Sequence, residues 1–125
     1  MRADKLKKEW RSRIIDHGEV DPNTLVVNPL NWRLHPRSQE KALTGVLDEI
    51  GWVQQVIVNT RTGLLVDGHL RVEAAVKRGE STIPVVYVDL SESEEATILA
   101  TLDPLAALAN SDAEILAELL EKTTT

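Results

Sequence analysis

The sequence predicts an α+β fold: a small mixed β-sheet flanked by helices, with a helical extension at the C-terminus. Three observations carry this prediction. Short apolar runs typical of strands alternate with amphipathic stretches typical of helices, glycine or proline marks most boundaries, and 125 residues fit one domain. The expected order is helix, strand, helix, hairpin, helix, strand and then further helices.

The first element is expected to be an amphipathic helix over residues 3–16. Leu6, Trp10 and Ile14 recur every four residues among basic residues, and Gly18 follows as a helix end. Two interpretations are open for this helix. It is either a basic arm for phosphates or an acidic partner, or a solvated helix that docks through its apolar stripe.

A short strand and a second helix are expected next. Residues 25–27 are an apolar run after a turn, which predicts the strand. Ser38 is placed to cap a helix over residues 39–50, and Gly51 is placed to end it. The face of this helix that is expected to be buried consists of Ala42, Leu43, Val46, Leu47 and Ile50.

The centre of the chain is expected to form a hairpin, a helix and a strand. In residues 55–66, two apolar runs flank a turn at Thr60–Gly63, as in a hairpin. A helix is expected to begin directly after Gly68, at about His69, and to run to Arg78. Residues 83–88 are almost wholly apolar and predict a strand.

The C-terminal part is expected to be helical. Ser91–Glu94 has the form of a capping box and opens a helix to about Leu102. Residues 103–109 are expected to form another turn or short helix, and a second capping box at Ser111–Glu114 opens a final helix.

Charge is sorted along the chain. Residues 1–41 carry nine basic and six acidic side chains, residues 42–89 carry four and six, and residues 90–125 carry one and eight. The total of −6 argues against a protein coated all over with DNA-binding charge. DNA contact, if any, is therefore expected in the basic N-terminal part, because an acidic recognition helix would be repelled by DNA phosphates.

The composition excludes several classes of protein. The chain has no cysteine, which excludes disulfides, thiolate metal sites and a cysteine nucleophile. No apolar run approaches the roughly 18 residues of a membrane span, and the N-terminus lacks a signal-peptide core. We therefore expect a soluble cytoplasmic protein with no membrane partner.

The stretch Asp67-Gly68-His69-Leu70-Arg71 is the most informative motif. A strand leads into a tight turn and the turn into a helix, whose first N–H groups lack helical partners and carry partial positive charge. Gly68 permits close approach to the backbone and Arg71 adds a cation, which predicts an anion site, usually for phosphate. The same junction is also common as plain architecture.

The roles of two side chains in this motif stay open at this point. Asp67 either binds a metal that accompanies the phosphates or caps the helix. His69 either contacts phosphate or acts as an acid–base group, or it is a structural or solvated residue.

Two further clusters are candidates for the same site. Asn28-Pro29 and Arg33 lie in a polar loop and either reach a ligand or form a turn with a surface arginine. The second cluster, Gly51-Trp52-Val53-Gln54-Gln55, places backbone amides and glutamine side chains at a sheet edge, with Trp52 expected in the core.

The order and spacing of four short motifs carry a resemblance to a known family. They are Asn28-Pro29 with Arg33, Gly51 with Gln54-Gln55-Val56-Ile57-Val58, Val66-Asp67-Gly68-His69-Leu70-Arg71, and Ile83-Pro84-Val85. Together they resemble the N-terminal domain of ParB-type chromosome-partition proteins, also called the ParB-like nuclease domain, of the ParB/sulfiredoxin superfamily. The nearest members are stand-alone bacterial or phage ParB-like proteins and domains joined to DNA methyltransferases.

The resemblance implies a division of the chain and a nucleotide site. It covers about residues 20–102, which leaves an N-terminal helical segment, 1–19, and an acidic C-terminal helical extension, 103–125. In ParB the start of the corresponding helix, Gly-Glu-Arg-Arg-x-Arg-Ala, holds the triphosphate of CTP. Gly68, Arg71 and the alanine remain here, whereas His69 replaces the glutamate and Leu70 and Glu73 replace two arginines.

Two other branches of the superfamily differ at the same turn. Sulfiredoxin has a nucleophilic cysteine where this chain has His69, so sulfiredoxin chemistry is excluded. Free-serine kinases carry Asp-Gly-His-His-Arg, and the present motif differs from it only at Leu70.

The leading hypothesis is a ParB-like domain that binds CTP, ATP or ADP, with Mg²⁺, at the Gly68–Arg71 turn. The resemblance implies that Asn28, Arg33 and Gln54 line the same groove, and that Asp67 or His69 assists the metal or the phosphate. The protein would act in partition, phage DNA handling or DNA modification, beside a DNA methyltransferase or another phage or partition protein, or as a homodimer.

Three alternatives stay open. One is a nucleotide-dependent kinase for a small hydroxylated molecule, with His69 and Asp67 as candidate catalytic residues. Another is a non-catalytic protein-interaction module. Nuclease activity is less favoured, because metal-dependent nucleases converge several acidic ligands and only Asp67 stands out.

Overall fold

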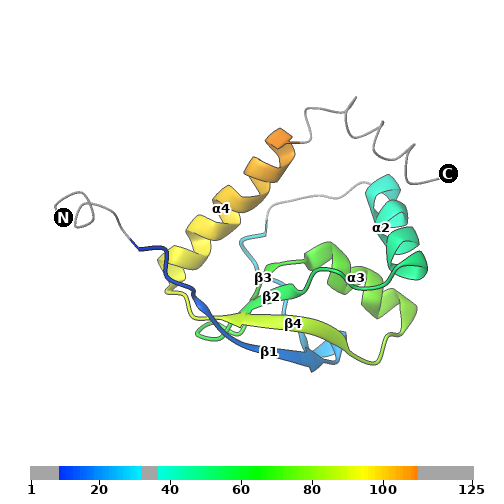
Figure 1. Ribbon diagram of the computed structural model, residues 1–125, viewed down its shortest axis with the longest axis horizontal. Helices are drawn as coiled ribbons and strands as arrows, with labels where there is room; N and C mark the ends of the chain where they lie inside the picture. Colours follow the sequence, from blue (N-terminus) through cyan, green and yellow to red (C-terminus); the bar gives the residue numbers. More distant parts are fainter. Residues whose placement is uncertain (1–8, 32–36, 110–125) are drawn as a thin grey trace.

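A four-stranded mixed sheet forms the centre of the computed structural model, which describes residues 9–31 and 37–109, with side chains as far as Thr101. The strands β1 (Ile14–Val20), β2 (Val56–Asn59), β3 (Leu65–Asp67) and β4 (Ile83–Val88) lie in the order β1-β4-β2-β3 (Figure 1). β2 runs parallel to β4, while β1 pairs with β4 and β3 with β2 in antiparallel fashion. The expected mixed sheet, with 55–66 as a hairpin, is confirmed.

The described helices are η1 (Pro22–Thr24), α2 (Arg37–Glu49), α3 (His69–Arg78) and α4 (Glu92–Ala109). The start and end of α3 agree with the sequence prediction. α4 begins at the expected capping box: the Ser91 hydroxyl accepts from the Glu94 N–H at 3.2 Å, and the Glu94 carboxylate accepts from the Ser91 N–H at 2.8 Å. In the described part of the chain, no helix has the length and apolarity that crossing a membrane requires.

The hydrophobic core lies between the central strands and α3. Its buried members are Val56, Val58, Leu65, Val72, Ala75, Ile83 and Val85. Trp52 is partly buried and packs against this cluster, as the sequence predicted. Because β2 and β4 are the inner strands and α3 covers them, the start of α3 is fixed directly beside β2.

The helix predicted over residues 3–16 is wrong wherever the structure describes it. Residues 9–13 are not helical, and Ile14 begins β1, whereas residues 1–8 lie outside the described residues. The hydrogen bonds that β1 forms with β4 along its length favour a strand over the helix that the four-residue apolar spacing indicated. The β-branched residues Ile14 and Ile15 at its start also favour a strand. Gly18 therefore ends no helix: it lies opposite Val85 in the ladder.

Several more sequence predictions need correction. Residues 25–27 form no strand, because Val26 makes only an isolated bridge to Leu64. Helix α2 begins at Arg37, so Ser38 lies inside it and does not cap it. The helix has no buried residue, and Val46 and Ile50, which were expected to be buried, are 46% and 71% exposed. Helix α2 lies beside α3 and is joined to it by two ion pairs, Glu40–Lys77 and Asp48–Arg78, so polar contacts hold it in place. Helix α4 continues without a break through residues 103–109, where a separate turn or short helix was expected.

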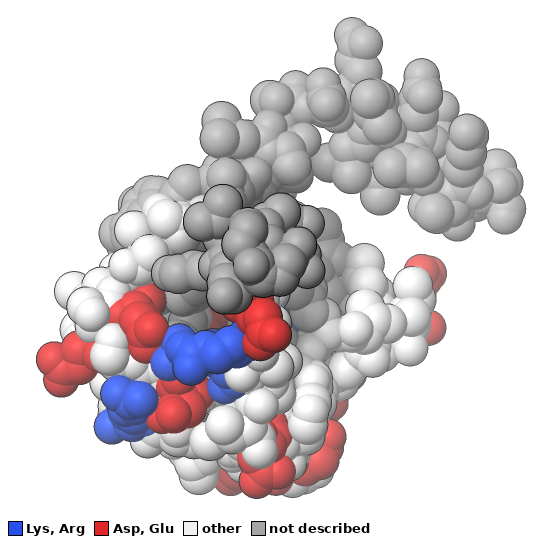
Figure 2. Space-filling model, turned by 60° about the vertical axis from the view of Figure 1, so that its left-hand side comes forward, with Lys and Arg blue, Asp and Glu red and all other residues white. Residues whose placement is uncertain are grey.

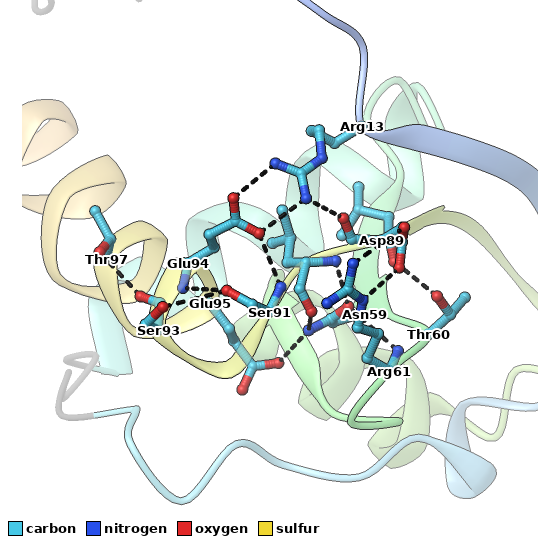
Figure 3. A network of polar contacts seen from close by, with 12 residues as sticks. Arg13, Asn59, Thr60, Arg61, Asp89, Ser91, Ser93, Glu94, Glu95 and Thr97 are labelled. Carbon is cyan, nitrogen blue, oxygen red and sulfur yellow. Dashed lines mark hydrogen bonds and ion pairs between the residues drawn. The ribbon is translucent and has the colours of Figure 1, made fainter.

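Buried amide contacts join the β2–β3 hairpin to the start of α4 (Figure 3). The Asn59 side chain is fully buried, donates to the Leu90 carbonyl at 3.0 Å and accepts from the Leu90 N–H at 3.0 Å. It also donates to the buried Glu95 carboxylate at 3.1 Å, which accepts from the Thr62 hydroxyl at 2.6 Å. Every polar group named here has a partner, as burial requires.

A second set of contacts in Figure 3 ties the start of β1 to α4. The Arg13 guanidinium donates to both Glu94 carboxylate oxygens, at 2.9 and 2.8 Å, and to the Asp89 carbonyl at 2.7 Å. The hydrogen bonds from Arg13, and then the one from the Ser91 N–H, lower the pKa of Glu94 from 4.5 to about 2.

The lowered pKa of Glu94 predicts a pH-dependent contribution to stability. Because Glu94 binds its proton less readily in the folded chain, its contribution is complete above about pH 4.5 and is lost as the pH falls toward 2. The difference in unfolding free energy between the wild type and Glu94→Gln should therefore shrink between pH 5 and pH 2, as measured by urea denaturation. A pH-independent difference for Glu94→Gln would contradict the assignment.

Candidate functional site

The turn between β3 and α3 is built around Gly68, a position that strongly favours glycine. Gly68 precedes the first residue of α3 with φ 98° and ψ 21°, in the left-handed region. A Cβ at this position would lie 2.6 Å from Val56 Cγ1 and 2.9 Å from Val56 Cβ. The sequence predicted that a ligand approaches the backbone closely at Gly68. In the structure, the Val56 side chain of β2 occupies the space beside this glycine.

Arg71 lies one turn into α3 and folds back over the turn. Its Nη2 lies 3.3 Å from Asp67 Oδ2 and 3.4 Å from the Gln55 carbonyl oxygen. The two ionic side chains are mostly covered, with 17% of Arg71 and 24% of Asp67 exposed. Nε of Arg71 is buried and has no hydrogen-bond partner. The arginine is therefore held by long contacts and leaves a strong donor unused.

His69 is the first residue of α3 and is buried, with 8% of it exposed. Its Nε2 accepts from the Asn28 backbone N–H at 3.2 Å, which assigns the ring proton to Nδ1. The histidine thus fastens the loop at Asn28 to the start of α3. Of the two interpretations left open by the sequence, these contacts favour the structural one.

Asn28 is held in place on every side. It is fully buried, donates from Nδ2 to the Leu65 carbonyl at 3.0 Å, and accepts on Oδ1 from the Leu30 N–H at 2.9 Å. These contacts join its loop to β3. Its side chain is used within the fold, so its contribution to a ligand site is to position the loop. Arg33, from the same predicted cluster, lies outside the described residues.

The glutamines before β2 have different roles. Gln54 is exposed, whereas Gln55 is partly buried and its carbonyl accepts from Arg71. The Gln55 side chain lies 3.2 Å from Nδ1 of His17 on β1. Sequence reasoning missed His17 because it placed the preceding residues in a helix, and nothing local indicated that this segment joins the sheet.

The structure thus brings together Asp67, Gly68, His69 and Arg71 at one turn. Gln55 contacts Arg71, and Asn28 contacts His69. Gly68 supplies no side-chain cap, so the first N–H groups of α3 keep their partial positive charge at the turn. Leu70 contributes its backbone there. This arrangement can bind an anion through backbone amides and one guanidinium.

The same residues do not make a metal site of their own. Among the described residues there is no group of three or more histidine, aspartate or glutamate side chains that could hold a metal ion. Asp67, the predicted metal ligand, lies against Arg71 as its counter-ion. Mg²⁺ prefers several oxygen ligands in octahedral geometry, which one aspartate engaged by an arginine does not supply.

Two hollows lie elsewhere on the described part of the chain. One of about 190 Å³ separates α2 from α3 and is lined by Leu47, Trp52 and Ala75 among others. Another, of about 290 Å³, lies beside the start of α4 and is lined by Arg13, Leu90 and Ile98 among others. Neither includes a residue of the Asp67–Arg71 turn.

The comparisons with known proteins identify the fold. No family model and no curated protein sequence matches the chain. Among solved structures, it is similar to the C-terminally truncated chromosome-partitioning protein ParB from Caulobacter crescentus complexed with CTP-γ-S, with 23% identity and a TM-score of 0.59. It is also similar to a Pnob8-like ParB-N domain, with 17% identity and a TM-score of 0.55.

The matched region is a large part of this chain and a smaller part of the relatives. It covers 67% of this chain and 50% of the Caulobacter chain, and 68% of this chain and 34% of the Pnob8-like chain. The chain therefore has the fold of the ParB N-terminal domain, as its motifs implied.

The packing of Gly68 predicts a large cost for any side chain there. Gly68→Ala should lower the unfolding free energy by about 3 kcal/mol, from left-handed strain plus overpacking against Val56. Gly63→Ala is the matched control, because Gly63 has φ 71° and open space, and it should cost only about 1 kcal/mol. Urea denaturation measures both. Equal costs for the two variants would show that Val56 does not press on the turn.

The buried hydrogen bond of His69 predicts a structural effect in the absence of any ligand. His69→Ala should lower the unfolding free energy by about 2 kcal/mol, because the buried Asn28 N–H loses its acceptor. His17→Ala, at an exposed position, should change it by less than about 0.5 kcal/mol. Thermal and urea unfolding of the two variants would test this, and an unchanged stability for His69→Ala would refute the structural role.

Proposed function

We propose that this chain binds a nucleotide through its phosphate at the Asp67–Arg71 turn and acts in a DNA transaction. One observation carries the proposal: the start of α3, without a side-chain cap, lies beside a guanidinium whose Nε has no acceptor. The fold adds support, because a similar solved structure is a chromosome-partitioning ParB complexed with CTP-γ-S.

Each residue at the turn has a role in this proposal. The first backbone amides of α3, at His69, Leu70 and Arg71, and the Arg71 side chain bind the phosphate. Gly68 holds the turn in its left-handed conformation. Asn28 positions the neighbouring loop, and Gln54 is exposed beside Gln55, where a ligand at the turn would meet it. Arg33 is assigned to the same groove from the sequence alone.

The contacts favour binding over catalysis. A kinase would use His69 or Asp67 to move a proton, but Nε2 of His69 accepts a buried N–H and Asp67 is paired with Arg71. CTP, ATP and ADP are all candidate ligands, with any Mg²⁺ brought by the nucleotide phosphates.

The proposed role in DNA transactions rests on the fold and on charge. The similar structures are a chromosome-partitioning protein and a ParB-N domain. Around the start of β1 and α4, Figure 2 shows basic side chains interspersed with acidic ones, and Arg13 and Arg61 are paired with Glu94 and Asp89. DNA contact through the N-terminal part would therefore depend on the basic residues before β1, or on a partner protein such as a DNA methyltransferase or partition protein.

Nucleotide binding that depends on Arg71 is the test of this function. Calorimetric titration with CTP, ATP and ADP, each with Mg²⁺, should give saturable binding of at least one. Arg71→Ala should weaken that binding by about tenfold or more, since charge-assisted hydrogen bonds contribute about 1.5–3 kcal/mol.

Arg78→Ala is the matched control for this experiment. Arg78 lies at the other end of the same helix and is likewise paired with an aspartate, so its removal should leave the affinity unchanged. Circular dichroism would verify that all variants are folded. No binding of these nucleotides, or of the monophosphates CMP and AMP, by the folded wild type would refute the proposal.

A further inference from the structure

The turn carries an acid that opposes the cation on which phosphate binding depends. Arg71 is the only basic residue between positions 67 and 73, where Asp67 and Glu73 are acidic. We propose that Asp67 is an internal counter-ion that competes with the ligand's phosphate for Arg71. The site therefore prefers a ligand with a single phosphate group to a triphosphate. This inference rests on the function proposed above and names its ligand class.

The backbone places the two charges together. Asp67 is the last residue of β3, where it pairs with Ile57 of β2, and Arg71 follows one helical turn later. Between them Gly68 lies so close to Val56 that a Cβ at this position would be 2.6 Å from Val56 Cγ1, and the turn is therefore tight. The backbone therefore places the two charged residues next to each other, and the partial burial of their side chains limits screening of the pair by solvent.

The contacts of Arg71 are long, which leaves room for a ligand to compete for this side chain. Both acceptors of Nη2 lie at 3.3–3.4 Å, beyond the usual 2.7–3.2 Å, and Nε has none. A phosphate offers several charged oxygens in a geometry that suits the guanidinium fork. It would therefore compete well against Asp67 for this side chain.

Charge then decides which phosphates are accepted. Arg71 is balanced by Asp67, and Glu73 is exposed on the same first turns of α3, so the segment has one more acid than base. The amides at the helix start add only about half a positive charge. Each further phosphate group on a ligand adds negative charge without a new cation from this segment, so repulsion rises from a monophosphate to a triphosphate.

The experiment compares nucleotides that differ only in phosphate number. CMP, CDP and CTP are titrated in EDTA into the wild type and Asp67→Asn, with AMP, ADP and ATP as a second series. The wild type should bind the monophosphate more tightly than the triphosphate. Asp67→Asn should raise the affinity for the triphosphate by about tenfold and change that for the monophosphate less. Asp48→Asn, in which the aspartate paired with Arg78 is changed, should alter neither.

The outcomes separate this inference from the function on which it rests. The counter-ion role is refuted if, in EDTA, the wild type binds the triphosphate more tightly than the monophosphate. It is also refuted if Asp67→Asn leaves the affinity for the triphosphate unchanged. In both cases nucleotide binding itself stands. A loss of triphosphate affinity in Asp67→Asn that appears only with Mg²⁺ would identify Asp67 as a metal ligand and refute it too. Binding of none of the six nucleotides refutes the proposed function itself. If Asp67→Asn does not fold, the order of affinities of the wild type for the mono-, di- and triphosphates decides whether the inference holds.

Discussion

The packing of Gly68 against Val56 is the constraint on which the candidate site depends. It places the end of β3, the start of α3 and the inner strand β2 in direct contact, with no room for a side chain at position 68. Because α3 begins directly at this junction, its first amides and Arg71 have a fixed direction, and Asp67 is held one turn from that arginine. A looser connection would leave the same residues in the sequence without a common geometry.

Buried polar contacts then fix what surrounds the junction. Asn28 and His69 connect a loop to the start of α3, and Asn59 connects the hairpin to Leu90 before α4. These side chains are costly to bury without partners, so their hydrogen bonds specify one arrangement of the loops. The consequence for function is that His69, which by type is a candidate acid–base group, serves the fold. The buried side-chain donor without a partner at the turn is Nε of Arg71, and beside the first amides of α3 it suits anion binding.

Local sequence signals were sufficient to predict the elements whose boundaries depend on neighbouring residues. The glycines at 68 and 79 bracket α3, and the Ser91–Glu94 capping box starts α4, so both helix starts could be predicted. Long-range pairing decided the rest. β1 is a strand because β4 lies beside it, although its apolar spacing also suits a helix. Likewise, Asn28 was predicted as a ligand contact, since its partner His69 is 41 residues away and only the folded chain joins them.

The most direct test of the account is to locate the ligand on the folded chain by NMR. Backbone ¹H–¹⁵N chemical shifts would be followed while CMP, and then CTP with Mg²⁺, is added to the labelled wild type. Phosphate binding at the turn predicts saturable shifts that are largest at the amides of Gly68 to Arg71 and extend to Gln54 and Gln55. Shifts centred on the hollow between α2 and α3, around Trp52 and Ala75, would contradict it, as would the absence of saturable shifts.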